Sequence, residues 1–168
     1  MTKQKILVIG TGGTIGAKAG STITADAPLK ILSLYTPPAG VDLIGRAAFD
    51  RFSEHADLGY LEQLCTYMQG IDYSAYRGVV LLHGSDTLTY TAALLAHLLP
   101  DKPLVLVAAG TPPEAPGSNA LPNLDLAVQY LRSVPPRIGA LCAGPGPGVP
   151  PAPHFANHAP PGHRLRCL

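Results

Sequence analysis

Three short runs of apolar residues stand out along the chain, and none of them alternates with polar positions. They span Ile6–Ile9, Val79–Leu82 and Leu104–Ala109. Uninterrupted runs of this length, rich in Val, Ile and Leu, are typical of strands that are buried on both faces of a parallel sheet. A fourth short strand is expected at Ile138–Ala143.

Apolar side chains recur at helical spacing in residues 57–69, which predicts a helix with one buried face. The side chains on that face would be Leu58, Leu61, Leu64, Cys65 and Met68. The preceding region, 27–52, has a mixed pattern, from which we expect a short helix near 28–34 and a strand within 41–52.

Two further helices are predicted in the second half of the chain. One spans 86–99, with Ser85 or Asp86 as its N-cap. The other spans 123–133, with Asn123 as its cap. Ser, Asp and Asn are favoured at this position because their side-chain oxygens accept hydrogen bonds from the free N–H groups of the first helical turn.

The predicted strands and helices alternate along the chain, and this order indicates an α/β fold. We expect an open, doubly wound, mostly parallel sheet of the flavodoxin-like or Rossmann-like kind, with right-handed crossovers. A length of 168 residues allows one domain with a hydrophobic core. We place that single domain at residues 1–144.

The remaining residues, 145–168, have a different composition and are predicted to form a tail rich in Pro, Gly and His. From Ile138 to His163 the chain contains no Asp, Glu, Lys or Arg. Such a segment has few backbone donors and no periodicity, so it cannot form a helix or a central strand. Its His residues and Cys167 could be drawn as metal ligands, but without a scaffold to position them we expect no metal site.

The charge of the chain limits its possible partners. Lys and Arg number 12 and Asp and Glu number 11, for a formal net charge of +1. A charge this small creates no field to attract nucleic acid or an anionic membrane. No apolar stretch approaches the roughly 18 residues of a membrane span, and the first apolar run is too short for a signal peptide. We therefore expect a cytoplasmic protein.

The first strand leads into a glycine-rich loop, Gly10-Thr11-Gly12-Gly13-Thr14-Ile15-Gly16. Glycines allow a sharp turn at the carboxyl end of a strand, where α/β sheets bind ligands. A dinucleotide fingerprint would need a third glycine at Ile15, and a phosphate loop would need Gly-Lys-Ser/Thr. Both nucleotide interpretations fail. The remaining interpretation is a ligand-binding loop that offers the Thr11 and Thr14 hydroxyls and several backbone amides. A tight structural turn is the alternative.

A second polar cluster, His83-Gly84-Ser85-Asp86-Thr87, follows the Val79–Leu82 run. Free N–H groups and the helix dipole favour an anion at a helix start, so Ser85 could contact a carboxylate and Asp86 an ammonium group. His83 would orient the cluster. A plain N-cap is the simpler interpretation of this motif alone. However, both loops follow strands of one parallel sheet and could face one ligand at its carboxyl edge.

The sequences TGGTI at 11–15 and HGSDT at 83–87 resemble the two signatures of the bacterial-type L-asparaginase/glutaminase family. The second signature usually reads HGTDT, and Ser85 keeps the hydroxyl group. The similarity continues through Lys102–Val107 and Asn123-Leu124, and it covers residues 5–133. It extends over the N-terminal domain of that family.

This resemblance implies hydrolysis of the side-chain amide of L-asparagine to L-aspartate and ammonia through an acyl-threonine intermediate. Thr14 corresponds to the nucleophile, and Ser85 and Asp86 to the pair that assists it. The residues expected to bind the substrate are Gly13, Ser53, Glu54, Gly84, Ser85 and Asp86. A threonine hydroxyl needs a base and oxyanion donors to attack an amide, and the glycine loop can supply backbone amides. The resemblance implies no cofactor. It also implies a homo-oligomer, either a dimer or a tetramer.

The chain also departs from the family pattern. The family has a lysine soon after the Asn-Leu segment, where this chain has Val134, and the nearest basic residue, Arg132, stays protonated. Asn119 stands in the place of an acidic residue, and segment 19–23 has no tyrosine. The family's second, smaller domain has no counterpart in this sequence.

These departures leave two further interpretations open. The first is an amino-acid-binding module that has lost turnover. The second is a chain whose charge-free tail comes from a shifted reading frame near 135–145.

Overall fold

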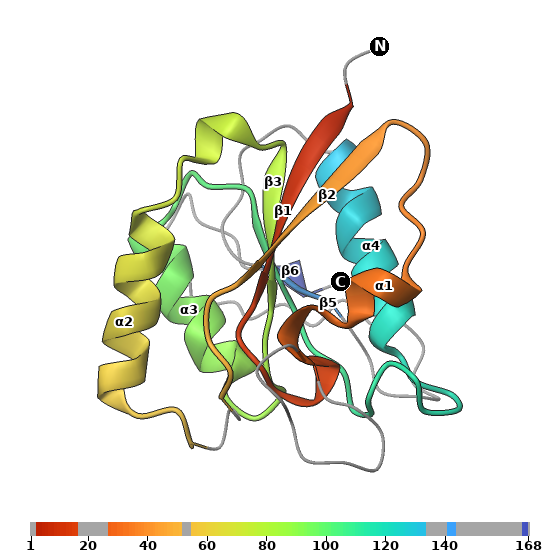
Figure 1. Cartoon of the computed structure of the whole chain (residues 1–168). Coiled ribbons are helices and arrows are strands. Elements are labelled where there is room, and N and C mark those ends of the chain that lie inside the picture. The colour runs from red at the N-terminus through yellow and green to blue at the C-terminus, as the bar shows by residue number, and fades with distance from the viewer. Residues whose placement is uncertain (1–2, 17–26, 52–54, 134–140, 144–165, 168) are drawn as a thin grey trace.

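The computed structural model describes residues 3–16, 27–51, 55–133, 141–143 and 166–167. Within them, all strand pairs are parallel and form one sheet in the order β2-β1-β3-β4-β5-β6 (Figure 1). The strands are β1 (Gln4–Gly10), β2 (Val41–Ala47), β3 (Gly78–Leu82), β4 (Leu104–Val107), β5 (Leu141–Ala143) and β6 (Arg166–Cys167). The predicted open, parallel α/β sheet is confirmed, and its first five strands have the flavodoxin-like order.

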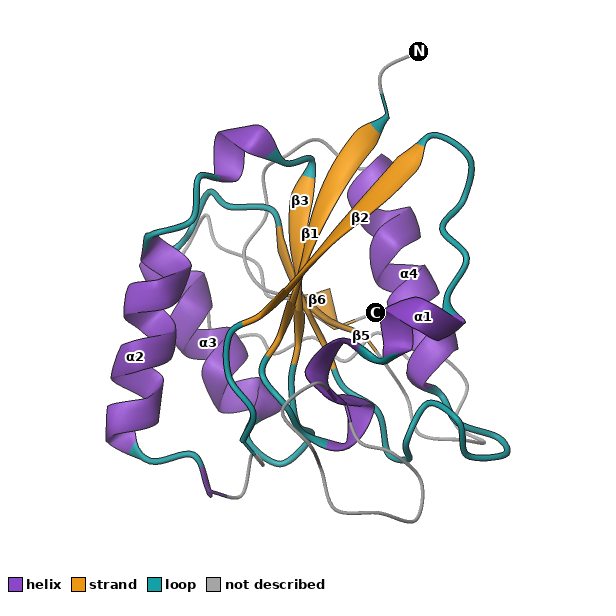
Figure 2. Ribbon diagram, viewed as in Figure 1, coloured by secondary structure: helices purple, strands orange, loops and turns teal. Residues whose placement is uncertain are grey.

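Helices cover both faces of the sheet (Figure 2). On one face lie α1 (Ile31–Leu34) and α4 (Ala120–Ser133), and on the other lie α2 (Leu58–Gln69) and α3 (Leu88–Leu98). Three short 3-10 turns complete the described elements: η1 (Thr14–Gly16), η2 (Ala27–Leu29) and η4 (Tyr73–Ala75). Among the described residues, no helix is both long enough and apolar enough to cross a membrane.

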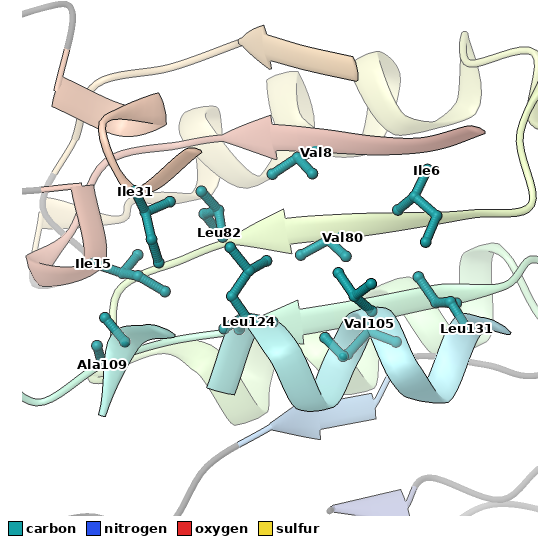
Figure 3. Close-up of a cluster of buried hydrophobic side chains, with 14 of the residues drawn as sticks. Ile6, Val8, Ile15, Ile31, Val80, Leu82, Val105, Ala109, Leu124 and Leu131 are labelled. Carbon is teal, nitrogen blue, oxygen red and sulfur yellow. The ribbon is translucent and has the colours of Figure 1, made fainter. Parts of the chain in front are cut away.

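The central strands bury both of their faces, as their uninterrupted apolar runs predicted. In β1, Ile6 and Val8 point into the layer under α1 and α4, while Leu7 and Ile9 point into the layer under α2 and α3. All four side chains are fully buried. Figure 3 shows the first of these layers, where valines of the sheet meet Leu124 of α4.

The crossover from β4 to β5 has the opposite hand to the others. The strand order advances in one direction from β3 through β4 to β5, yet α3 and α4 lie on opposite faces (Figure 1). The β3–β4 crossover is right-handed, so the β4–β5 crossover is left-handed, and our expectation of right-handed crossovers throughout is wrong here. Because α3 contacts β5 on its own face, α4 covers β4 and β5 from the opposite face. The apolar stripe of α4 is buried beside α1 instead.

The helix 57–69 is confirmed as α2, and its predicted apolar face is confirmed except at Leu58, because Leu61 and Cys65 pack against the same cluster as the buried Leu64 and Met68. Asp57 is the N-cap, and its carboxylate accepts a hydrogen bond from the Tyr60 N–H at 2.7 Å. Tyr60 is buried together with Leu64 and Met68, whereas Leu58 is 81% exposed. The cap fixes the start of the helix and thereby turns Tyr60, not Leu58, toward the sheet.

Both helix caps that we predicted in the second half of the chain are wrong. Thr87, not Ser85 or Asp86, occupies the N-cap position of α3. The helix α4 begins at Ala120, and the buried Asn123 lies inside its first turn. The Asn123 side-chain amide donates to the Ala108 carbonyl at 2.8 Å, so this residue ties the helix to the end of β4.

The elements expected in the ambiguous and C-terminal regions are partly confirmed. The turn η2 and helix α1 correspond to the short helix near 28–34, and β2 lies within 41–52. Strand β5 covers the second half of Ile138–Ala143, and the first half lies outside the described residues. Two residues of the predicted tail form β6, an edge strand that the composition did not reveal, because it describes the segment only on average.

Candidate active site

The carboxyl ends of the strands lie in one row. Gly10 pairs with Ala47 on one side and with Leu82 on the other, and Leu82 pairs in turn with Val107. The chain leaves β1 toward β2 and later returns to β3 on the other side of β1, so the switch point of the sheet lies here, where α/β proteins bind ligands. The loops that follow β1 and β3 therefore start side by side.

The first loop, Thr11–Gly16, is anchored at both of its ends. The Thr11 hydroxyl donates to the Leu82 carbonyl at 2.7 Å, and the Thr11 N–H donates to the same oxygen at 3.1 Å. At the other end, Ile15 is fully buried in the core, near Ile31 (Figure 3). Thr14 lies between these anchors and is half-buried at the rim of the sheet.

The second loop, His83–Thr87, touches the first loop through two glycines. A Cβ atom on Gly13 would lie 2.6 Å from the Gly84 Cα and 2.7 Å from the Gly84 N, so no side chain fits between the loops. Gly13 also has φ of +75°, a conformation that favours glycine. Ser85 and Asp86 follow this contact and are exposed. The structure thus brings the loop that carries Thr14 against the loop that carries Ser85 and Asp86.

The segment that follows β2, residues 48–51, borders the other side of the first loop. The Arg51 N–H donates to the Thr11 carbonyl and the Arg51 carbonyl accepts from the Gly13 N–H, both at 3.1 Å. The two predicted substrate-binding residues Ser53 and Glu54 lie outside the described residues. The described chain therefore reaches the first loop two positions before Ser53.

Tyr60 packs against residues of the segment 48–51, a contact that the sequence pattern did not reveal. The Arg51 guanidinium lies 5.7 Å from the centre of the Tyr60 ring, and Phe49 packs edge-on against the same ring at 5.4 Å. Burial raises the pKa of the Tyr60 hydroxyl, and the Thr11 side chain and the Arg51 charge oppose this rise, so the phenol is neutral near pH 7. Tyr60 lies four residues before Leu64 and eight before Met68, a helical spacing that could have placed it on the buried face.

His83 lies behind the second loop and is 1% exposed. Its Nδ1 is 2.8 Å from the Gly84 carbonyl oxygen, and its Nε2 is 3.2 Å from the Thr91 hydroxyl. Burial lowers the pKa of the imidazole, more than the hydrogen bond to Gly84 raises it, so the ring is neutral near pH 7. Since both ring nitrogens are engaged, His83 orients the loop and is not placed to act as a base.

A third loop, residues 108–119, closes the row and is ordered mainly by its own contacts. The Asn119 side-chain oxygen accepts a hydrogen bond from the Gly110 N–H at 3.1 Å. This role needs an acceptor and no charge, so asparagine can fill it in place of the expected acidic residue. An ion pair of 2.7 Å between Lys30 and Glu114 fastens the loop to the start of α1.

Arg132 lies at the opposite edge of the sheet from these loops. Its carbonyl accepts a hydrogen bond at 3.3 Å from Arg77, and the Arg77 N–H is bonded to Lys5 near the start of β1. Arg132 therefore cannot replace a lysine at the candidate site, and Val134 lies outside the described residues. Within the part of the chain that the structure describes, no cluster of three or more His, Cys, Asp or Glu side chains could hold a metal ion.

The family model for the N-terminal domain of asparaginases matches residues 5–142. This chain belongs to the asparaginase family. The match includes both strands and both loops of the candidate site, so the switch point described above is the corresponding region of an asparaginase domain.

Curated relatives of this asparaginase-family chain fall into two groups. The L-asparaginase of Thermococcus kodakarensis is 30% identical over 77% of this chain and 41% of its own length. A component of the glutamyl-tRNA(Gln) amidotransferase of Pyrococcus abyssi is 31% identical over 77% of this chain and 31% of its own length. The chain thus spans about a third to two fifths of the length of these relatives.

Solved asparaginase structures share the fold. The thermostable L-asparaginase of Thermococcus kodakarensis matches with a TM-score of 0.65 and 29% identity, over 77% of this chain and 41% of that one. A probable cytoplasmic L-asparaginase of Campylobacter jejuni matches with a TM-score of 0.64 and 28% identity, over 84% and 44%.

Proposed function

We propose that this asparaginase-family chain hydrolyses the side-chain amide of L-asparagine, with Thr14 as the nucleophile. The observation that supports this most is the backbone contact between Gly13 and Gly84, which sets the Thr14 loop against Ser85 and Asp86 at the switch point. The family assignment supports an amidohydrolase in general. The identity of the substrate and the roles of the residues are part of the proposal.

The reaction begins when the Thr14 Oγ attacks the carbon of the side-chain amide. A C–O bond forms, and the electron pair of the carbonyl moves to its oxygen, where backbone N–H groups of the glycine loop stabilise the negative charge. When the tetrahedral intermediate collapses, the C–N bond breaks and the protonated nitrogen leaves as ammonia. Water then attacks the acyl-threonine ester, which releases L-aspartate and restores the Thr14 hydroxyl.

The second loop would serve both the chemistry and the binding of the amino-acid end of the substrate. Ser85 and Asp86, with a water molecule, would carry the proton from the Thr14 hydroxyl to the leaving nitrogen, and Asp86 would also bind the α-ammonium group. Thr87, and not Ser85 or Asp86, holds the N-cap position of α3. Gly13, Gly84, Ser53 and Glu54 would complete the binding site. No cofactor takes part in this scheme.

Release of ammonia by the purified chain tests the proposal. We expect ammonia from L-asparagine and none above background from Thr14→Ala. The variant Thr14→Ser keeps a hydroxyl and should retain measurable activity. Equal ammonia release from the wild type and Thr14→Ala would contradict the role of Thr14, and no release from either would contradict the hydrolysis itself.

A second candidate is suggested by the amidotransferase relatives, since several of them are 31% identical over about three quarters of this chain. Their name indicates enzymes that handle an amide nitrogen within a complex. On this alternative the chain would act on an amide as part of a larger assembly and would be weak or inactive alone. Calorimetry separates the two: binding of L-aspartate without ammonia release from L-asparagine or L-glutamine would favour the second candidate, or the binding module.

We further propose that the chain works in the cytoplasm as a homo-oligomer. Only 14% of its residues are charged, and a charge-poor surface favours association. One structural neighbour is described as cytoplasmic. Light scattering at assay concentration should give the mass of a dimer or a tetramer, and a clean monomer would contradict the oligomer.

A further inference from the structure

Two buried polar side chains lie behind the second loop, one on the loop and one on the following helix. His83 is 1% exposed, and Thr91, in the first half of α3, is fully buried. The Thr91 hydroxyl lies 3.2 Å from the His83 Nε2, and the His83 Nδ1 lies 2.8 Å from the Gly84 carbonyl oxygen. A buried polar group without a hydrogen-bond partner costs free energy, so these hydrogen bonds stabilise the buried positions of both side chains.

The partners of the imidazole determine where its proton sits. The Gly84 carbonyl can only accept a hydrogen bond, so the His83 Nδ1 must carry the hydrogen. A neutral imidazole has one N–H, which leaves Nε2 as an acceptor, and the Thr91 hydroxyl must therefore donate to it. The donors thus run in one direction, from Thr91 to His83 and from His83 to Gly84.

The hydrogen bond to the Gly84 carbonyl fixes the orientation of the peptide plane between Gly84 and Ser85. The peptide bond between Gly84 and Ser85 is trans, so its N–H points opposite to its carbonyl. Because the carbonyl of Gly84 points inward to the imidazole, the N–H of Ser85 points outward. Ser85 itself is exposed and begins the polar part of the loop.

We propose that Thr91 and His83 are positioning residues that hold the Ser85 N–H toward an anionic oxygen of the substrate. Neither residue touches the substrate; each acts through the orientation of the Gly84–Ser85 peptide. This inference rests on the proposed function for the identity of the ligand, but the hydroxyl–imidazole–carbonyl series does not depend on it. A backbone N–H held in advance binds a negative oxygen without the entropic cost of ordering the loop.

The series itself is tested by nuclear magnetic resonance of the full chain with ¹⁵N-labelled histidine. We expect His83 at neutral pH as the neutral form with the hydrogen on Nδ1. In Thr91→Val, which keeps the shape of the side chain but removes the hydroxyl, the Nε2 resonance should shift; in Thr91→Ser it should stay near its wild-type position. A wild-type His83 with the hydrogen on Nε2, or with both nitrogens protonated, would overturn the inference whether or not the chain hydrolyses any amide.

The positioning role is tested by ligand binding with the same pair of variants. Thr91→Val should weaken L-aspartate binding on the order of tenfold, the scale of one hydrogen bond to a charged group, and Thr91→Ser should restore most of that affinity. If L-asparagine is hydrolysed, KM and kcat should follow the same order. Equal affinity in the wild type and a folded Thr91→Val would overturn the role. Should Thr91→Val not fold, His83→Asn supplies the second test, because its shorter amide can donate to Gly84 but cannot reach Thr91.

Failure of this inference and failure of the proposed function have different signatures. If the wild type neither binds L-aspartate nor releases ammonia, the proposed function fails, and with it the role toward substrate, while the histidine spectrum still decides the hydrogen-bond series. If the wild type binds L-aspartate and Thr91→Val binds it equally well, the function stands and the positioning role fails.

Discussion

At the scale of single residues, glycines set the distance between the two loops. Gly13 and Gly84 meet through their backbones. A Cβ atom on Gly12 would likewise lie only 2.6 Å from the backbone N of Arg51. Each glycine therefore removes a side chain that would push the Thr14 loop away from one of its neighbours. The geometry of the site depends on this close packing as much as on the polar residues.

Gly13→Ala should therefore disrupt the candidate site, and Gly40→Ala is its matched control. Both glycines have positive φ, +75° and +83°, but a Cβ on Gly40 would meet nothing within 4 Å. Gly40→Ala should cost about 1 kcal/mol of unfolding free energy for the conformation alone. Gly13→Ala should cost more and should abolish L-aspartate binding, because the loops must separate. Urea unfolding and calorimetry check this, and equal costs at both positions would contradict it.

The sequence predicted that the loop of Thr14 and the loop of Ser85 and Asp86 lie together, because both loops follow buried strands and parallel strands end at one edge. It could not locate Arg51, Tyr60 or Thr91. Arg51 contributes through its backbone, which carries no residue signature. Tyr60 and Thr91 lie on helices, and which side of a helix faces a loop depends on where the helix starts and how it packs.

At the scale of elements, α2 illustrates how the N-cap of a helix influences which of its side chains face the sheet. The Asp57 carboxylate accepts from the Tyr60 N–H, and the helix that starts there places the Tyr60 ring 5.7 Å from the Arg51 guanidinium. The apolar spacing of 57–69 predicted the helix and most of its buried face, but it assigned Leu58 to that face and left out Tyr60. With the helix starting after the Asp57 cap, Tyr60 is buried and Leu58 is 81% exposed.

Asp57→Ala should lower the free energy of unfolding by about 1 kcal/mol, the usual contribution of an N-cap. Asp57→Asn is the matched control, since its side-chain oxygen can still cap the helix while the charge is removed. The ion pair between Asp57 and Arg51 is 3.8 Å long and exposed, so its loss in Asp57→Asn should cost little. Thermal unfolding distinguishes the two, and an equal loss in both variants would show that the charge, not the cap, matters.

The start of α3 was mispredicted for a related reason. Ser85 and Asp86 are both good capping residues, so local preference favoured them. The backbone of the second loop is instead held by the contact with Gly13 and by the hydrogen bond from His83, and the helix starts only after these constraints end. One contact that is distant in sequence, Gly13–Gly84, and one between neighbours, His83–Gly84, thus overrule a local preference and leave Ser85 and Asp86 exposed.

At the scale of the whole molecule, the left-handed β4–β5 crossover puts α4 and α1 into one layer over the sheet. The apolar stripe of α4 fills this layer, and Leu124 is fully buried there against the sheet (Figure 3). The alternation of elements predicted the α/β fold but not this crossover, because the order of elements does not specify which face of the sheet a helix covers.

Leu124→Ala should therefore destabilise the whole domain by about 2–5 kcal/mol, the cost of a cavity in a packed core. Leu126→Ala, on the same helix, is the control, because Leu126 is 37% exposed and its loss should cost well under about 1 kcal/mol. Urea unfolding measures both. Similar costs for the two variants would contradict the burial of α4 against the sheet.

The stability of the whole domain should also depend on pH through His83. Burial lowers the pKa of the folded imidazole below its ordinary value of 6.5. Below pH 6.5 the unfolded chain therefore binds a proton that the folded chain does not, and the free energy of unfolding decreases as the pH falls toward the folded pKa. His83→Asn should reduce the slope of unfolding free energy against pH between about pH 7 and pH 5. Unfolding in urea across this range measures the slopes, which can be compared even if His83→Asn is less stable at every pH. A wild-type slope in His83→Asn would show that the imidazole is not held neutral by the fold.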